Sequence, residues 1–181
     1  MTRAEVDQLV DWAATEGWNP GRHDADVFWE TDPHAFVAAE VDGGLAGGGA
    51  ITSYAGQYGF MGFFIMRPEY RGRGLGNQLW HARRDRLQAR LAPGAAIGMD
   101  GVFAMQSYYA KGGFAFSHRN LRFRRAVPAG VATLRKEGRA TMVPLADVPF
   151  EDIARYDRRC FPAPRPAFLR RWTAMPESLS L

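Results

Sequence analysis

Three glycines at alternate positions, Gly72, Gly74 and Gly76, follow an apolar run from Phe60 to Met66 that is typical of a buried strand. A helix is predicted to begin near Gly74, so the glycines lie between a strand and a helix N-terminus. Backbone N–H groups there lack intrahelical partners, and the helix dipole favours negative charge. Glycines also omit the Cβ atoms that would hold a phosphate away from those N–H groups. The stretch therefore predicts an anion site.

The glycine spacing excludes two common phosphate-binding loops. No Gly-Lys-Ser or Gly-Lys-Thr follows the glycines, so the loop is not a P-loop. The pattern G-x-G-x-G, without an acidic residue at the ribose-binding distance, is also a poor dinucleotide fingerprint. A strand-to-helix turn that needs glycines only for close packing remains the alternative.

A second motif lies further along the chain, where Tyr109, Gly113 and Phe114 form Tyr-x-x-x-Gly-Phe. The first motif can be written Arg71-x-x-Gly74-x-Gly76. In this order and at this distance, the two motifs resemble those of the GNAT N-acetyltransferase superfamily. The acyl-CoA pyrophosphate loop of that superfamily has the pattern Gln/Arg-x-x-Gly-x-Gly/Ala. The resemblance covers about residues 1–126.

The resemblance implies an α/β (α+β) GNAT fold, with a mixed, mostly antiparallel sheet that has a central parallel strand pair and is flanked by helices. It also implies acetyl-CoA as co-substrate and no metal. The backbone of the strand before the loop should pair with the pantetheine arm, and the loop N–H groups should hold the diphosphate. The implied cofactor-binding residues are Phe64, Ile65, Met66, Arg71, Gly72, Arg73, Gly74, Leu75, Gly76 and Asn77.

Tyr109 matches the family position that serves as general acid toward the departing thiolate. Tyr108 is the fallback, because a shift of one residue along a helix would exchange the faces of the two side chains. The general base stays unassigned, since residues 60–66 contain no acid. A water relay, an amine that arrives neutral, and four side chains remain open as its source: Glu40, Asp100, Glu30 and His34. Glu69 is discounted because a diphosphate would repel a carboxylate there.

The expected function is acyl-CoA-dependent N-acyl transfer, with acetyl passing from acetyl-CoA to a primary amine by direct attack in a ternary complex. The acceptor, a small molecule or a protein amine, is not identified. The alternative is a non-catalytic acyl-CoA-binding regulatory module, against which the presence of Tyr109 argues. A nucleic-acid-binding role is not expected, because Arg119, Arg122, Arg124 and Arg125 lie in no nucleic-acid signature. A homodimer is left open.

The composition is that of one globular domain with an appendage. The 181 residues carry a net charge of +4, which suits a polyanionic ligand. No apolar run approaches the roughly 20 residues that a membrane span needs, so no membrane partner is expected. A single cysteine, Cys160, excludes an intramolecular disulfide and favours a cytoplasmic protein.

Residues 1–100 are predicted to form two helices, a three-stranded antiparallel meander and a strand–helix–strand crossover. Thr2 and Glu5 have the spacing of a capping box at the start of the first helix. The strands are expected at 36–41, 45–54 and 57–66. Gly47–Gly49 indicate a bulge or a close backbone approach, and a loosely packed edge is the alternative. A helix over 74–90 should lead to a strand at 96–100 that runs parallel to the third strand.

The helix over 74–90 has Leu75, Leu79 and Leu87 on one side. Its arginines are assigned to the other, solvated side, where one or two could lie near the ribose phosphate; they are Arg83, Arg84, Arg86 and Arg90. A short helix over 102–111 and strands at 114–116 and 121–124 should follow.

The predicted domains are a catalytic GNAT domain at 1–126 and a C-terminal extension at 127–181. The extension resembles the start of a second GNAT-like unit, with a strand at 143–145 and helices at 150–159 and 168–172. A segment of this length cannot enclose its own core. It is therefore expected to pack on the first domain or on a partner chain.

Overall fold

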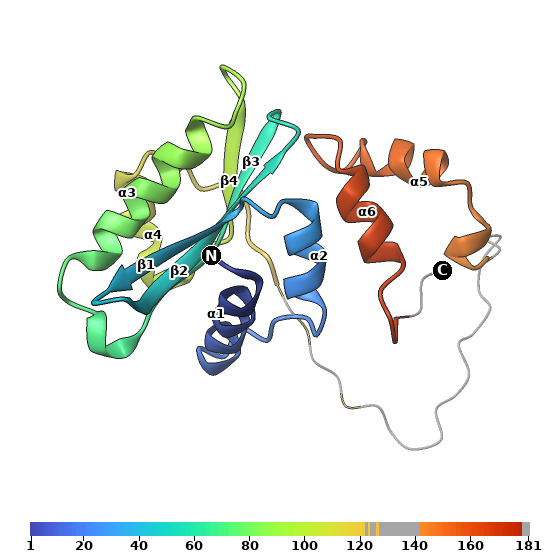
Figure 1. The fold of residues 1–181 in the computed structure, drawn as a ribbon. Coiled ribbons are helices and arrows are strands. Elements are labelled where there is room, and N and C mark those ends of the chain that lie inside the picture. The colour runs from blue at the N-terminus through green and yellow to red at the C-terminus, as the bar shows by residue number, and fades with distance from the viewer. Residues whose placement is uncertain (122, 124–125, 127–141, 179–181) are drawn as a thin grey trace. The chain divides into compact units, whose positions relative to one another are not determined.

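The computed structural model describes residues 1–121, 123, 126 and 142–178 (Figure 1). The chain divides into two compact units, which are described separately. The first comprises Met1–Asp100 with Pro144–Leu181, and the second comprises Gly101–Val143.

A four-stranded sheet forms the centre of the first unit. Its strands are β1 (Phe36–Val41), β2 (Gly44–Tyr54), β3 (Tyr58–Met66) and β4 (Ala96–Met99), in the order β1-β2-β3-β4. The first three form an antiparallel meander, and β3 pairs with β4 in parallel. The mixed sheet confirms the predicted GNAT topology, although the parallel pair lies at one edge of the described sheet rather than at its centre.

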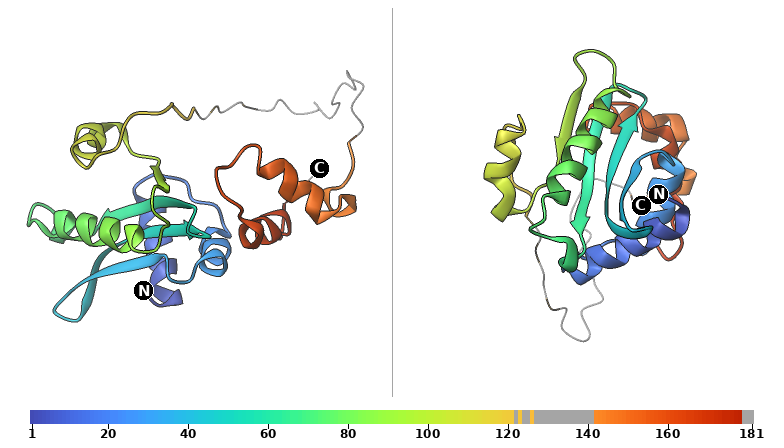
Figure 2. Two further views of the ribbon diagram at one scale, coloured as in Figure 1. Left: turned by 90° about the horizontal axis from the view of Figure 1, so that it is seen from above. Right: turned by 60° about the vertical axis from the view of Figure 1, so that its left-hand side comes forward.

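Helices cover both faces of this sheet (Figure 2). On one face, α1 (Arg3–Thr15) and α2 (Asp24–Thr31) enclose a core formed by Val6, Leu9, Ala13, Ala25, Phe36, Ala50 and Ile65. The opposite face is covered by α3 (Leu75–Gln88), whose buried residues include Leu79, Trp80 and Leu87. Helix α3 connects the two parallel strands, as the crossover rule requires.

A β-bulge interrupts the pairing of β2 with β3. Gly49 lies opposite Phe64, but Ala50 lies opposite Gly62, so Phe63 is the extra residue. Its φ of 33° is unusual for a residue that carries a side chain. The bulge predicted from the glycine run is therefore present, and it falls on the strand that leads to the glycine loop.

One arginine of α3 that the sequence predicts on the solvated side is buried, so this prediction is wrong. Arg83 is buried, with 1% of its surface exposed, and it lies between Leu79 and Leu87 on the inner face. The four-residue spacing on either side of Arg83 places it on the leucine face of a helix. Arg86 is exposed, and Arg90, beyond the end of α3, forms an ion pair with Asp32 at 2.6 Å.

The C-terminal segment of the first unit is helical and packs on the sheet domain. It contains a 3₁₀ turn, η3 (Leu145–Asp147), and two helices, α5 (Phe150–Asp157) and α6 (Pro166–Thr173). The strand predicted at 143–145 is wrong, because Pro144 leads directly into the 3₁₀ turn. Phe168 and Leu169 of α6 are buried with Val27 of α2 and Tyr54 of β2. The segment thus shares the core of the first unit, as expected from its length.

The second unit contains a 3₁₀ turn, η2 (Phe103–Met105), and a short helix, α4 (Gln106–Lys111). Gly113 adopts a φ of 92° just beyond the helix, a conformation that ends helices. Residues 114–116 do not form the predicted strand. The predicted strand at 121–124 lies partly outside the described residues. Arg122, Arg124 and Arg125 lie outside them. In the described part of the chain, no helix is long and apolar enough to span a membrane.

Candidate functional site

The glycine loop follows β3 through a 3₁₀ turn, η1 (Pro68–Tyr70), and leads into α3. Gly72 and Gly74 have φ values of 71° and 79°. A Cβ atom placed on either glycine would have no heavy atom within 4 Å. The two glycines are therefore required by the backbone conformation and not by close packing, which argues against the packing-only interpretation of the loop.

The first turn of α3 is suited to bind an anion. Gly74 is its N-cap residue and supplies no side-chain cap, and the turn contains no acidic residue. Leu75, Gly76 and Asn77 form this turn, where backbone N–H groups point along the helix axis. A Cβ on Gly76 would touch Met66 and Phe64 only at 3.5 and 3.9 Å, so its absence leaves a little extra room. The helix dipole adds a favourable interaction of about 0.3–1 kcal/mol for a negative charge.

Arg71 holds the start of the loop in place. Its Nε donates to the carbonyl of Met66 at 2.8 Å, and its guanidinium forms an ion pair with Glu16 next to the end of α1. Its backbone N–H donates to Pro68 at 3.2 Å. The predicted use of the Arg71 N–H for a diphosphate would thus require the end of this 3₁₀ turn to open.

Two further arginines lie beside the loop. The guanidinium carbons of Arg67 and Arg73 lie 5.8 and 5.7 Å from the centre of the Tyr70 ring. Arg67 is also paired with Glu69, which reduces the negative charge beside the loop. Arg73 therefore contributes a cation next to Gly72 and Gly74.

The end of β3 has an open edge next to the loop. β4 pairs with β3 only from Tyr58 to Met61. Among the described residues, the segment from Gly62 to Met66 has no strand on that side, although β2 pairs with its other edge. This segment contains the three strand residues predicted to bind cofactor: Phe64, Ile65 and Met66. An extended ligand with amide groups could add to such an edge as a strand does.

Tyr108 and Tyr109 lie on α4 in the second unit. The centres of their rings are 6.0 Å apart. Tyr109 packs so closely on Gly101 that a Cβ there would lie 2.4 Å from the Tyr109 ring. Burial raises the pKa of the Tyr108 hydroxyl. The first unit thus holds the predicted loop and strand residues, and the second holds both candidate acids.

The candidates for a general base have different surroundings. Glu30 of α2 forms an ion pair with Arg171 of α6. The backbone of His34 donates to Asp32 at 3.2 Å, and its carbonyl accepts from Arg90 at 3.4 Å. Glu40 lies on β1 beside a register shift. These surroundings single out no base.

Asp100 follows β4 directly. Burial raises the pKa of the Tyr58 phenol, and the negative charge of Asp100 raises it further.

A buried ion pair that sequence reasoning missed links α2, β2 and the end of α3. Asp32 is 6% exposed, and it accepts from Arg90 at 2.6 Å and from the backbone of Ser53 at 2.9 Å. Arg90 also donates to the carbonyl of Ile51 at 3.0 Å. Asp32 stands at the C-cap of α2, and nothing in its local sequence indicates a partner 58 residues away. The pair joins elements that are distant in sequence.

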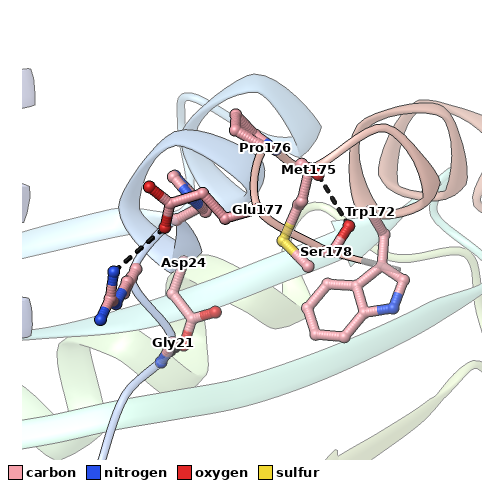
Figure 3. Close-up of a pocket in the computed structure, with 9 residues that line it drawn as sticks. Gly21, Asp24, Trp172, Met175, Pro176, Glu177 and Ser178 are labelled. Atoms are coloured by element: carbon pink, nitrogen blue, oxygen red, sulfur yellow. Dashed lines mark hydrogen bonds and ion pairs between the residues drawn. The ribbon is translucent and has the colours of Figure 1, made fainter. Parts of the chain in front are cut away.

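A hollow of about 400 Å³ lies where the chain after α6 meets the start of α2 (Figure 3). Its lining residues include Gly21, Asp24, Trp172, Met175 and Glu177 and none from the glycine loop. Two pairs among the lining residues bind one another: Asp24 accepts from the Gly21 backbone at 2.8 Å, and Glu177 forms an ion pair with Arg22 at 3.0 Å (Figure 3). We interpret this hollow as the junction of the C-terminal segment with α2.

The structure is that of an α/β protein in which a strand, a glycine loop and a helix N-terminus follow one another directly. The family model of the acetyltransferase (GNAT) family matches residues 3–114, and the chain belongs to this family.

Two curated relatives illustrate the similarity. The chain is 24% identical over 166 residues to holothin acyltransferase of Pseudoalteromonas sp. (strain SANK 73390), across 91% of this chain and 53% of that protein. It is 34% identical over 76 residues to an acetyltransferase of Yersinia pestis (strain Pestoides F), across 42% of this chain and 53% of that protein. The chain thus spans about half the length of each of these two relatives.

Solved structures show the same fold. A putative acetyltransferase from Pyrococcus horikoshii has a TM-score of 0.68 at 15% identity, and the match covers 96% of this chain and 59% of that one. A predicted acetyltransferase with acetyl-CoA from Clostridium acetobutylicum has a TM-score of 0.50 at 14% identity, covering 68% of this chain and 92% of that one.

Proposed function

We propose that the protein is an acyl-CoA-dependent N-acyltransferase that transfers acetyl from acetyl-CoA to a primary amine. The main support is the loop between β3 and α3, where Gly72 and Gly74 have left-handed backbones and open space beside them. This geometry suits a diphosphate, and the open edge of β3 suits the amides of the pantetheine arm that would extend from it.

In the proposed reaction the amine attacks the thioester carbonyl within a ternary complex. A C–N bond forms, the C–S bond breaks, and the CoA thiolate leaves. Tyr109 donates its proton to the thiolate, and the amine loses one proton to water or to a base that stays unassigned. The family membership and the bound acetyl-CoA of the Clostridium acetobutylicum structure support CoA as the acyl carrier.

The direct test measures acetyl-CoA binding by calorimetry and thiol release from acetyl-CoA over a panel of primary amines. Cys160 is exposed and would react with thiol reagents, so the assay should use Cys160→Ser alongside the wild type. Binding with amine-dependent thiol release supports the proposal. Binding without release on any amine would favour an acyl-CoA-binding module, and failure to bind acetyl-CoA would contradict both.

Gly74→Asp tests whether the loop is the site that binds CoA. The carboxylate would repel a diphosphate and the Cβ would strain a left-handed backbone, so acetyl-CoA affinity should fall by roughly 100-fold, about the value of one or two charge-assisted hydrogen bonds. Gly94→Asp is a matched control, because Gly94 has a φ of 81° and equally open surroundings outside the loop. Equal affinities of the two variants would contradict the assignment of the loop.

A further inference from the structure

Arg83 is a buried cation in the middle of α3 for which the proposed reaction has no chemical use. Its Nη2 donates to the carbonyls of Ala50 on β2 and Gly62 on β3, at 2.7 and 2.6 Å. A buried charge is costly unless it is well hydrogen-bonded, so these carbonyls stabilise it where it lies. Each bond is made to one of the two strands that meet at the bulge.

The bonds of Arg83 surround the strained residue of β3. Phe63 has a φ of 33°, and such a conformation persists only where the surroundings hold it. Arg83 donates to the carbonyl of Gly62, the residue before Phe63. The guanidinium carbon of Arg83 lies 5.1 Å from the ring centre of Phe64, the residue after Phe63. The side chain therefore contacts the bulge on both sides of Phe63.

Gly49 on the neighbouring strand leaves room for this arrangement. A Cβ at Gly49 would lie 2.3 Å from the carbonyl oxygen of Phe63 and 2.5 Å from the guanidinium carbon of Arg83. Real Cβ atoms do not approach other atoms so closely, and the first of these contacts is with backbone. Gly49, Phe63 and Arg83 thus form one packing unit.

The position of the bulge determines which part of β3 can receive a ligand. Pairing with β4 stops at Met61, two residues before Phe63. Bulges commonly bend a strand and end its pairing. The segment from Gly62 to Met66, which contains the bulge and leads to the glycine loop, keeps its edge open among the described residues.

We infer that Arg83 is a positioning residue for the pantetheine arm of acyl-CoA, because it holds the bulge that opens this edge of β3. The inference rests on the proposed function, since it presumes that the loop binds CoA. Two different parts of the protein would then bind the two halves of acyl-CoA. The loop would bind the nucleotide half, and the edge of β3 that Arg83 supports would bind the pantetheine arm.

The test compares the affinities of acetyl-CoA and of its nucleotide half, 3′-phosphoadenosine 5′-diphosphate, by calorimetry. Arg83→Met keeps much of the side-chain volume but removes both hydrogen bonds. Acetyl-CoA affinity should fall roughly tenfold, about the effect of one lost hydrogen bond, while affinity for the nucleotide half stays unchanged. Arg83→Lys, which keeps a donor, should recover part of the loss. Gln88→Met on the exposed side of α3 should change neither affinity.

Gly49→Ala provides a second variant that keeps Arg83 and disturbs the same bulge. Like Arg83→Met, it should lower the ratio of acetyl-CoA affinity to nucleotide affinity. If Arg83→Met does not fold, Gly49→Ala and Arg83→Lys together test the role of Arg83. If the ratio of acetyl-CoA affinity to nucleotide affinity is unchanged in the folded variants, the proposed role of Arg83 is wrong, but the proposed function is not contradicted. Failure of the wild type to bind acetyl-CoA would overturn the proposed function, and the inference with it.

Discussion

At the level of single residues, the proposed chemistry depends most directly on Tyr109. Tyr109→Phe removes only the hydroxyl that would protonate the thiolate. Turnover should fall about 10²- to 10⁴-fold, the usual contribution of a general acid, with little change in the Kd for acetyl-CoA. Steady-state kinetics and calorimetry would measure the two quantities separately.

Tyr108→Phe is the matched control on the same helix. It should leave turnover nearly unchanged if Tyr109 is the acid. The reverse pattern would transfer the role to Tyr108, and full activity of both variants at every pH would contradict a tyrosine acid altogether.

Arg83 shows why residue-level prediction from sequence failed for one side chain. Its charge predicts the solvated side of α3, although its four-residue spacing from Leu79 and Leu87 is that of the buried face. The decisive partners are the carbonyls of Ala50 and Gly62, which lie 33 and 21 residues away in sequence. Only the folded sheet brings such acceptors to the helix.

At the level of elements, α1 begins with a complete capping box. The backbone N–H of Thr2 donates to Glu5 at 2.6 Å, and the Thr2 hydroxyl accepts from the Glu5 backbone at 3.3 Å. The bond from the Thr2 backbone is the main reason that the pKa of Glu5 is lowered. A lowered folded-state pKa means that Glu5 stabilises the fold above its unfolded pKa of about 4.3, and that this is lost as pH falls through the folded value.

Glu5→Ala should therefore lower the free energy of unfolding by roughly 0.5 kcal/mol at pH 7, because solvent screens this carboxylate, and the difference from wild type should shrink below about pH 4. Urea denaturation at pH 7 and pH 3 would measure it. Asp11→Ala, on an exposed position of the same helix, is the control. A Glu5→Ala effect of equal size at both pH values would show that the carboxylate bond is not its cause.

At the level of the whole chain, the C-terminal segment is part of the core of the first unit. Phe168 is 7% exposed, its ring centre lies 5.6 Å from that of Phe28, and the guanidinium carbon of Arg165 lies 4.6 Å from its ring centre. Phe161 meets Tyr54 edge to face at 4.9 Å. Burial raises the pKa of the Tyr54 hydroxyl in this junction. The contacts predict that the segment and the sheet domain unfold together.

Phe168→Ala should lower the free energy of unfolding by about 3 kcal/mol, because it leaves a cavity between α6 and α2. Tyr156→Ala, at a position that is 68% exposed, should change it by less than about 0.5 kcal/mol. Urea denaturation followed by tryptophan fluorescence would compare the two. A separate early transition for the C-terminal segment would contradict the shared core.

Local sequence was enough to predict most helices and strands of residues 1–100 and the glycine loop. The capping box at Thr2 and Glu5, the meander and the glycines before α3 follow from hydrophobic period, turn residues and backbone freedom, all of which act over a few residues. The same local signals led to errors at 114–116 and at 143–145. A strand forms only where another strand supplies its hydrogen bonds, and local pattern carries no such information.

Tertiary structure decided what surrounds the loop. Local patterns gave neither the ion pair of Asp32 with Arg90 nor the bonds of Arg83 to the bulge, since each joins groups at least 21 residues apart. The φ values of Gly72 and Gly74, and the open space beside them, distinguish a loop suited to a diphosphate from a close-packed turn. Sequence thus indicated where a phosphate could bind, and long-range packing determined the shape of the strand edge beside it.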